Sequence, residues 1–306
     1  MDALSRVLTL VQSELCLDVL CQFSGDFTID HKSLSSDEAM FHIVLSGNCW
    51  LLSPKGEALQ LKLGSFVFLP QGSEHQLSST KEAVHTPPIV EENMTGSLLI
   101  KKIKSEKKES NVELLCGRIK YTKGGGMLLM QCIPSLICIS LTSDPGLAIL
   151  NSLNEVVIYE SLHPNLGTLN IINSIAQILL TYALRRYIES NQTNSSWLNL
   201  LIDKRLGRSV QAMLNSPERS WSLKSLGKMA SMSRATYARV FKQKSGITPA
   251  KLLLSIRMMH ATKLLLNSNS SLSIISEAVG YRSEAAFSKA FKQVLGMTPG
   301  QWRCQH

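Results

Sequence analysis

A nine-residue segment near the carboxyl end of the chain occurs twice, and this duplication limits the possible folds more than any other feature. Residues 241–249 read FKQKSGITP, and residues 291–299 read FKQVLGMTP, at an offset of 50 residues. The similarity extends backward, because Ser233 matches Ser283 and Tyr237 is matched by another aromatic residue. Two copies are too few for a solenoid, so the repeat predicts one supersecondary unit that has been duplicated.

Each copy predicts two helices joined by a turn. A serine precedes every expected helix as its N-cap, and these serines are Ser222, Ser233, Ser271 and Ser283. The expected helices cover residues 223–230 and 234–244 in the first copy and about 272–279 and 284–294 in the second. Ser231 and Met232 form the first turn, and Gly280 supplies the second. Apolar residues at helical spacing over residues 249–266 predict a further helix that connects the copies.

Charge is distributed unevenly along the chain. The whole chain has a net charge of +9, but residues 1–203 hold 15 basic and 20 acidic side chains. Residues 204–306 hold 17 basic and only 3 acidic side chains, a net charge of +14. A basic third attached to an acidic remainder indicates a module that binds a polyanion, with a solvated basic surface as the alternative.

A helix-turn-helix places its second helix in the major groove of DNA, with the N-terminal residues of that helix near the base edges. Tyr237, Val240 and Phe241 form the expected core face of the first such helix. We predict that the outward residues contact DNA, namely Arg234, Ala235, Thr236, Ala238, Arg239 and Lys242 in the first copy and Ser283, Glu284, Ala285, Ser288, Lys289 and Lys292 in the second. Arg239 is suited to a bidentate contact with guanine, whereas hydroxyl groups and lysines are suited to phosphates.

Several motifs follow one another in this region. They are SRxxYxxxFK from Ser233, GITPAxxL from Gly246, RxxxAxxLL from Arg257 and VGYxSExxFxxxFK from Val279. With these motifs in this order, residues 200–303 resemble the AraC/XylS family of transcription regulators. The resemblance implies two helix-turn-helix units, bridged by one long helix, that contact successive segments of the major groove.

Short alternating apolar segments between residues 40 and 80 predict β-strands. The segments cover residues 41–45, 49–52, 59–63 and 66–69, and the pattern resumes at 112–121. Short strands with close turns predict a β-barrel or a double-sheet roll. The segment Gly64-x5-Pro70-x-Gly72-x2-His75 resembles the second cupin motif. The expected fold class is α+β, with an N-terminal cupin-like β-barrel and helical extension followed by an all-α domain of two helix-turn-helix units.

Histidines of the cupin-like region are candidate ligands for an effector or a metal ion. His75 occupies a ligand position of the resembled motif, but the His-x-His and glutamate of the first cupin motif have no counterpart. A metal ion would therefore need His42, His75 and either His31 or a cysteine. The sequence requires no cofactor, and the alternatives are a barrel without metal or one that binds a small organic ligand. The incomplete ligand set argues against enzyme activity, although a cupin enzyme with an appended basic domain is the rival class.

Seven cysteines without CxxC spacing argue against a disulfide framework or a zinc ribbon and favour a reducing cytoplasm. Cys49, Cys132 and Cys138 stand among apolar residues and are expected to be inert. The opening residues MDALSR, together with Cys21 and Cys116, are similar to the reactive-chlorine-responsive regulators of the AraC family. This similarity implies that Cys21 and Cys116 sense oxidants.

The remaining segments complete the expected domain organisation. Residues 82–111 are expected to form an exposed loop. Residues 166–188 predict a long helix, which by family resemblance mediates dimerisation and otherwise packs on its own barrel. The expected domains are a sensor at 1–165, a helical segment at 166–189, a linker at 190–197 and a DNA-binding domain at 198–306. No apolar run reaches the roughly 20 residues of a membrane span, and no signal peptide is expected.

These observations favour a cytoplasmic, sequence-specific transcription regulator that acts as an activator and a homodimer. Its expected partners are promoter DNA and RNA polymerase, and its expected signal is thiol oxidation by reactive chlorine species. A ligand or metal ion in the barrel is the alternative signal. A constitutive DNA-binding protein with an inactive barrel is a further alternative.

Overall fold

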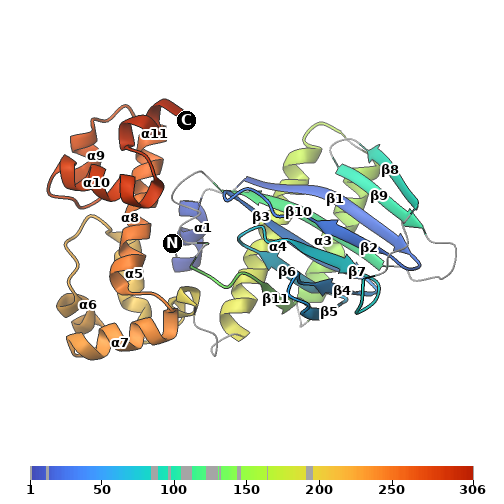
Figure 1. Cartoon of the computed structure of the whole chain (residues 1–306), viewed down its shortest axis with the longest axis horizontal. Helices are drawn as coiled ribbons and strands as arrows, with labels where there is room; N and C mark the ends of the chain where they lie inside the picture. The colour runs from blue at the N-terminus through green and yellow to red at the C-terminus, as the bar shows by residue number, and fades with distance from the viewer. Residues whose placement is uncertain are drawn as a thin grey trace. The chain divides into compact units, whose positions relative to one another are not determined.

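The computed structural model describes residues 2–11, 14–83, 89–95, 98–104, 112–121, 130, 132–142, 146–163, 165–190 and 196–305 (Figure 1). The chain divides into two compact units, which are considered separately below. A unit rich in strands contains residues 14–120 and 135–187. A helical unit contains residues 1–13, 121–134 and 188–306. Among the described residues, no helix is long and apolar enough to cross a bilayer.

Two sheets form the strand-rich unit. The larger sheet has the order β11-β6-β3-β10-β1-β9-β8 and contains β1 (Glu14–Ser24), β3 (Glu38–Ser46), β6 (Ser65–Leu69), β8 (Ile89–Thr95), β9 (Leu98–Lys104), β10 (Val112–Lys120) and β11 (Ile137–Ser140). The smaller sheet has the order β2-β7-β4-β5 and contains β2 (Thr28–His31), β4 (Asn48–Leu52), β5 (Ala58–Lys62) and β7 (His75–Ser78). The expected α+β class is confirmed. The described strands form two separate sheets, which is the double-sheet alternative to a closed barrel.

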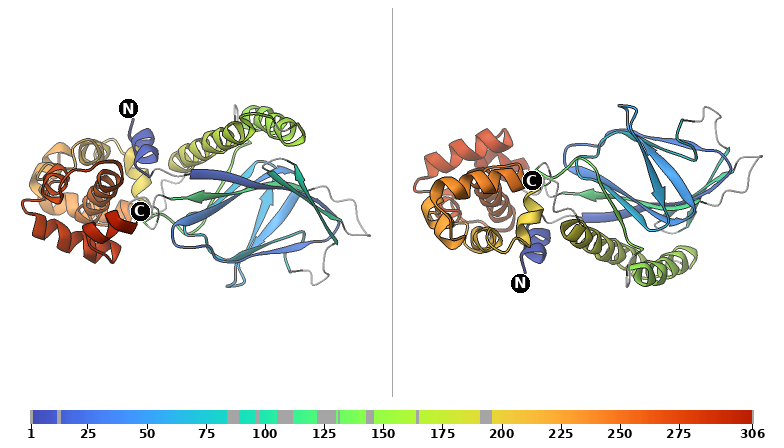
Figure 2. Two further views of the ribbon diagram at one scale, coloured as in Figure 1. Left: turned by 90° about the horizontal axis from the view of Figure 1, so that it is seen from above. Right: turned by 90° about the horizontal axis from the view of Figure 1, so that it is seen from below.

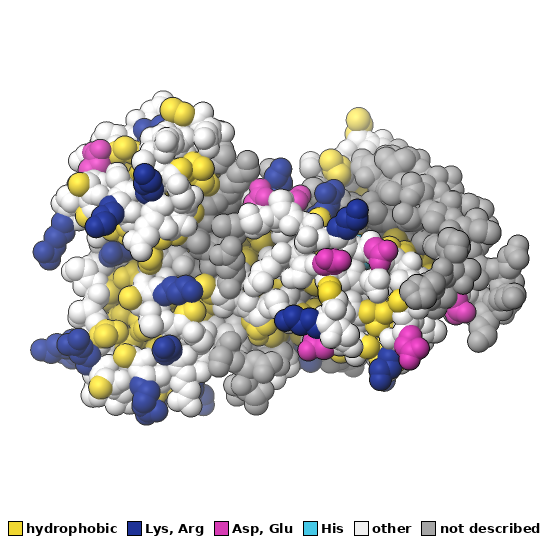
Figure 3. All heavy atoms as spheres, viewed as in Figure 1, with side chains coloured by type: hydrophobic (Ala, Val, Ile, Leu, Met, Phe, Trp, Pro, Cys, Tyr) yellow, Lys and Arg dark blue, Asp and Glu magenta, His cyan; other side chains and the backbone are white. Residues whose placement is uncertain are grey.

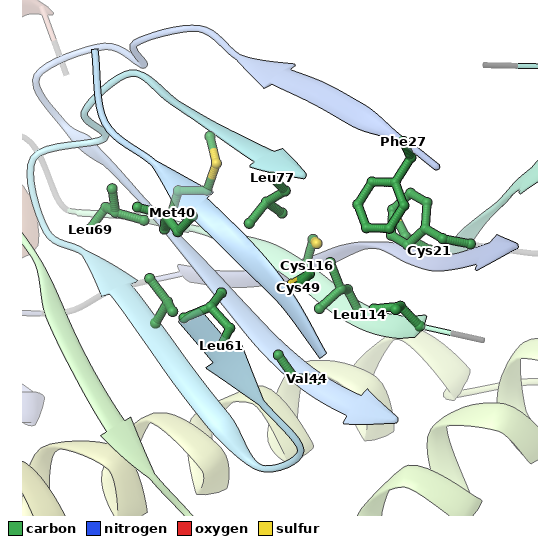
Figure 4. Packing of buried hydrophobic residues seen from close by; sticks show 14 residues of the cluster. Cys21, Phe27, Met40, Val44, Cys49, Leu61, Leu69, Leu77, Leu114 and Cys116 are labelled. Carbon is green, nitrogen blue, oxygen red and sulfur yellow. The ribbon is translucent and has the colours of Figure 1, made fainter. Parts of the chain in front are cut away.

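The core of this unit lies between the sheets. Val44 on β3 and Leu114 on β10 meet Leu51, Leu61 and Leu77 of the smaller sheet in one buried cluster (Figure 4). Because successive strand side chains point to opposite faces of a sheet, only alternate residues of each strand enter this cluster.

One glycine of the cupin-like segment is required by its surroundings. Gly64 has a φ of +74°, and a Cβ added there would lie 2.6 Å from Cγ2 of Thr142. A larger residue would be disfavoured by the backbone angle and would collide with its neighbour. This conformation turns the chain between β5 and β6.

Two helices cover the outer face of the larger sheet (Figure 2). They are α3 (Gly146–Leu162) and α4 (Thr168–Ser190). The long helix expected at 166–188 is confirmed as α4, but its apolar residues do not all face the protein. Ile172 and Leu179 are buried, whereas Leu169 is 50% and Ile178 is 41% exposed.

The expectation of a loop over residues 82–111 is wrong for two segments. Residues 89–95 and 98–104 form the antiparallel strands β8 and β9, and β9 pairs in parallel with β1. Residues with high strand propensity favour this pairing, namely Ile89, Val90 and Thr95 in β8 and Ile100 and Ile103 in β9. The rest of the expected loop includes residues 84–88 and 105–111, which lie outside the described residues.

The described part of the helical unit is built from helices. They are α1 (Ala3–Val11), the 3-10 helix η1 (Trp197–Leu201), α5 (Gly207–Asn215), α6 (Leu223–Met229), α7 (Arg234–Ser245), α8 (Pro249–Asn267), α9 (Leu272–Ala278), α10 (Glu284–Leu295) and α11 (Pro299–Gln305). The four expected serine N-caps are confirmed, because each side chain accepts a hydrogen bond from a backbone N–H in the first turn of its helix. The connecting helix expected at 249–266 is α8.

Gly280 makes the turn between α9 and α10. Its φ is +83°, and an added Cβ would lie 2.5 Å from the carbonyl oxygen of Glu218 and 2.7 Å from Nη2 of Arg257. Arg257 of α8 donates hydrogen bonds from Nε to the carbonyl of Pro217 and from Nη2 to that of Arg219. The turn is therefore packed closely against the chain segment that leads into the first helix-turn-helix.

The N-terminal helix α1 belongs to the helical unit and packs on α5 and α8. Val7 and Val11 are buried, and Arg6 donates a hydrogen bond from Nε to the carbonyl oxygen of Leu214 over 3.1 Å. A segment from the start of the sequence thereby contacts the long helix that connects the two repeats.

Candidate DNA-binding surface and sensor site

The first repeat presents one face of α7 to solvent. Tyr237 and Phe241 are fully buried, and the Tyr237 hydroxyl is 2.8 Å from Oγ of Ser209. This anchoring directs the opposite side outward. Of the residues predicted to contact DNA, Ala238 is half-buried and the others are exposed, namely Arg234, Ala235, Thr236, Arg239 and Lys242.

The second repeat has the same arrangement on α10. Phe287 and Phe291 are buried and pack edge to face against each other. Ser288 is half-buried, and the other predicted contact residues are exposed, namely Ser283, Glu284, Ala285, Lys289 and Lys292. The Ser283 hydroxyl already accepts a hydrogen bond from the backbone of Ala286, so capping occupies part of its bonding capacity. Contact of these residues with DNA remains a prediction.

The preceding helix α6 contributes basic residues that the sequence reasoning did not single out. Lys224 and Lys228 are exposed and line a hollow together with Ser225, Ser231 and Arg234. The first helix of a helix-turn-helix crosses the DNA backbone, so lysines here are suited to phosphates. Their spacing of four residues on a predicted helix was the signal available in the sequence.

The two repeats differ in charge. Residues 222–245 contain six basic and no acidic side chains, whereas residues 271–295 contain three basic and two acidic ones. In the second repeat, Ser273 and Glu277 occupy the positions of Lys224 and Lys228. Lys and Arg side chains are spread over the visible face of the helical unit (Figure 3). The phosphate backbone of DNA should therefore bind more strongly to the first repeat than to the second.

Four polar residues meet between the two sheets of the strand-rich unit. In the larger sheet, His42 of β3 lies opposite Cys116 of β10. In the smaller sheet, His31 of β2 lies opposite His75 of β7. His42 Nε2 is 2.8 Å from His75 Nε2, and His42 Nδ1 is 3.0 Å from Cys116 Sγ. The ring centroid of His31 is 4.8 Å from that of His42 and from that of His75.

The hydrogen bonds of this cluster determine where its protons lie. His75 Nδ1 is 2.8 Å from the carbonyl oxygen of Ser73, which accepts only, so Nδ1 carries the proton. In the neutral ring, His75 Nε2 is then an acceptor and His42 Nε2 the donor. His42 Nδ1 is left as an acceptor for the thiol of Cys116. Burial, with contributions from His31 and His75, lowers the pKa of His42 well below its usual range, which favours these neutral rings.

A solvent-open pocket reaches this cluster. Its volume is about 480 Å³, and His31 and His75 line it together with Asp30, Lys32 and Glu74. His42 lies deeper and is fully buried. The structure thus brings together His42 and His75, which were predicted as effector or metal ligands. Beside them lie His31, which was named as a possible third ligand, and Cys116, which was predicted as an oxidant sensor.

The predicted oxidant sensors, Cys21 and Cys116, lie on paired strands in the same core cluster (Figure 4). Both thiols are buried, each with 6% exposure. Cys21 pairs with Leu114, and Cys116 pairs with Val19, so the two cysteines are diagonal neighbours. No disulfide joins these two thiols.

Two of the cysteines expected to be inert lie in apolar surroundings. Burial raises the pKa of Cys49 to about 12 and that of Cys138 to about 11. Because the thiolate is the reactive form, both thiols are poor nucleophiles.

Comparisons with known proteins define the class of this chain. A cupin family model matches residues 2–189, and a helix-turn-helix domain model matches residues 226–305. Together with the duplicated helix-turn-helix fold, these matches define a DNA-binding transcription regulator with an N-terminal cupin domain. The chain belongs to the AraC family of such regulators.

Several relatives match nearly the whole chain, and three of them are described here. An uncharacterised HTH-type transcriptional regulator of Haemophilus influenzae is 30% identical over 99% of this chain and 98% of its own length. The HTH-type transcriptional regulator MtrA of Neisseria gonorrhoeae is 30% identical, with 99% and 98% covered. The RCS-specific HTH-type transcriptional activator RclR of Escherichia coli is 29% identical, with 99% and 97% covered.

Proposed function

We propose that this chain is a transcription activator that binds promoter DNA through α7 and α10 and is switched when reactive chlorine species oxidise Cys21 and Cys116. The observation that carries the DNA-binding part is the orientation of the two second helices, which bury their aromatic faces and expose their N-terminal residues. The Escherichia coli relative is named an RCS-specific activator, which supports reactive chlorine species as the signal and activation as the direction of regulation.

The position of the two thiols indicates how oxidation would change the structure. Hypochlorous acid converts a thiolate to a sulfenic acid with loss of chloride, and the sulfenic acid condenses with a second thiol to give a disulfide and water. A disulfide needs Cβ atoms about 3.5–4.5 Å apart, whereas diagonal neighbours in a sheet are about 7–8 Å apart. A bond between Cys21 and Cys116 therefore requires β1 to shift against β10.

Such a shift has a covalent route to the helical unit. Residues 1–13 precede β1 and residues 121–134 follow β10, and both segments belong to the helical unit. In that unit α1 packs on α8, the helix that joins the two repeats. We propose that movement of β1 changes the constraint that α1 places on α8, and thereby the fit of the two helix-turn-helix units to DNA.

The test is DNA binding by the purified full chain in its reduced form and after mild hypochlorite treatment. The DNA is a site that the chain selects from a random-sequence library, and binding is followed by fluorescence anisotropy, with transcription by RNA polymerase as a second readout. Cys21→Ser and Cys116→Ser should each abolish the oxidant response and leave binding of the reduced protein intact.

Cys304→Ser is the matched control, because Cys304 is exposed on α11 and lies outside the cluster. This variant should respond to hypochlorite like the unmodified protein. A response that survives both Cys21→Ser and Cys116→Ser contradicts the thiol switch.

The exposed apolar side chains of α3, α4 and their connection support a homodimer. They are Val156, Tyr159, Leu166, Leu169, Ile171 and Ile178, with exposures from 39% to 98%. Sedimentation of the full chain and of Tyr159→Lys tests this part, because a charge among these exposed apolar side chains should shift the protein toward monomer. We place the protein in the cytoplasm, where promoter DNA and RNA polymerase are found.

A regulator that responds to a small organic ligand or a metal ion in the cupin domain is the second candidate. The convergence of His31, His42 and His75 beside a pocket favours it. A change in DNA affinity on ligand or metal addition, in a variant without Cys21 and Cys116, would distinguish this candidate from the thiol switch.

A further inference from the structure

Three histidines from three different strands offer ring nitrogens to one point between the sheets. One nitrogen each from His31, His42 and His75 lies within 4.8 Å of the other two. We propose that these histidines bind one divalent transition-metal ion, and that Cys116 is the hydrogen-bond partner of His42 rather than a ligand. Three imidazoles with a fourth position open to solvent suit Zn²⁺ in tetrahedral geometry.

The spacing of the ring nitrogens requires only a small adjustment. His42 Nε2 and His75 Nε2 are 2.8 Å apart. Two nitrogens bound to zinc at about 2.0–2.1 Å in a tetrahedron are about 3.4 Å apart, so the rings must separate by about half an ångström. His31, which is half-buried at the pocket, has room to approach as the third ligand.

His75 already has the hydrogen-bond arrangement of a metal ligand. Its Nδ1 donates to the carbonyl oxygen of Ser73, which leaves the lone pair of Nε2 directed at the cluster. Metal-binding histidines usually donate their second ring N–H to a carbonyl or carboxylate, which holds the ring in place.

The geometry around His42 determines the role of Cys116. Sγ lies 3.0 Å from Nδ1, on the other side of the ring from Nε2. A His42 ligand that binds through Nε2 must carry its proton on Nδ1, which then donates to Sγ. Metal binding therefore releases the Nε2 proton and reverses the hydrogen bond, with the proton of Cys116 passing to Nδ1. The sulfur becomes the outer partner of a ligand, and the metal site is linked to a thiol that is a candidate oxidant sensor.

The pocket provides access for an ion. It opens to solvent beside His31 and His75. Asp30 and Glu74 on its wall carry two negative charges, against one positive charge on Lys32. A cation is therefore favoured at the opening, and a water molecule can take the fourth ligand position. The effect of such an ion on transcription rests on the proposed function, whereas its binding can be measured without DNA.

The experiment measures Zn²⁺ binding by the full chain after treatment with a chelator, by competition with a coloured zinc indicator and by native mass spectrometry. We expect one Zn²⁺ per chain. His31→Ala should weaken binding more than 100-fold, because a lost ligand costs more than the 10–100-fold of an outer partner. Cys116→Ala should weaken it 10–100-fold. His163→Ala is the matched control, because His163 is exposed and lies outside the cluster.

Co²⁺ in place of Zn²⁺ reports the ligand type. Nitrogen ligands alone give visible ligand-field bands, whereas a sulfur ligand adds an intense charge-transfer band at shorter wavelength. The site is refuted if the unmodified chain binds no stoichiometric Zn²⁺, or if His31→Ala binds as tightly as His163→Ala. A charge-transfer band that disappears in Cys116→Ala overturns the outer role of Cys116. Because His31 is partly exposed, His31→Ala is expected to fold, and circular dichroism checks that it does.

Discussion

Removal of Lys224 and Lys228 tests whether α6 contacts the DNA backbone. The logarithm of affinity falls linearly with the logarithm of salt concentration, and each phosphate contact makes this slope steeper by about 0.9. The double variant Lys224→Ala/Lys228→Ala should therefore flatten the slope by about 1.8. Between 50 and 200 mM salt, the affinity ratio of unmodified to variant protein should fall about twelvefold. Both side chains are exposed, so the variant should keep its fold.

Anisotropy titrations of the full chain at four or more salt concentrations give the slope. Lys55→Ala/Lys62→Ala makes the same charge change on exposed residues of the strand-rich unit, and its slope should equal that of the unmodified protein. Parallel salt plots for the unmodified protein and Lys224→Ala/Lys228→Ala would refute the phosphate contacts. An equal flattening in both double variants would show an effect of net charge rather than of α6.

Three further predictions concern specificity, stability and pH. Arg239→Ala should cost roughly 1–3 kcal/mol at the selected DNA site and little on random DNA, and equal losses on both would exclude base reading. Gly280→Ala should lower the free energy of unfolding by at least about 1–2 kcal/mol, because φ is +83° there. Gly300→Ala, where an added Cβ meets nothing within 4 Å, should not lower the free energy of unfolding in the same urea titration, because alanine is favoured over glycine inside a helix. Burial, aided by Arg6, lowers the pKa of His260. Below pH 6.5, which is the usual pKa of histidine, the unfolded chain binds a proton at His260 more readily than the folded chain does. The free energy of unfolding should therefore fall as the pH drops below 6.5, and it should fall less in His260→Gln.

The helical unit could be predicted almost entirely from the sequence, because its signals are local. Ser222 and Ser233 are N-caps within three residues of the backbone groups that they bind, and Gly246 adopts the left-handed conformation expected of a helix stop. Each of these signals operates within a few residues of chain. Because the second copy repeats the first at an offset of 50 residues, the same helices could be predicted for both copies.

The sensor site could be predicted only in part, because it depends on pairing between distant strands. His42 and Cys116 are 74 residues apart, and their contact requires one particular register of β3 and β10. A slip of one residue would turn either side chain to the opposite face of the sheet. The cupin resemblance identified His75, but the partnership of His31 with His75 depends on β2, which the sequence reasoning did not identify as a strand.

The charge difference between the repeats is present in the sequence, but the predicted DNA contacts all lie on the second helices or at their caps. Lys224 and Lys228 precede the recognition helix, and they became relevant only when the structure placed them beside Arg234 in one hollow.

The most direct test of the central conclusion is a hydroxyl-radical footprint of the full chain on its selected DNA site. Two helix-turn-helix units joined by α8 should protect two segments on one face of the DNA, about 10–10.5 base pairs apart. Arg239→Ala should weaken the protection by the first repeat more than that by the second. A single protected segment, or uniform protection without a selected sequence, would contradict DNA reading by both repeats.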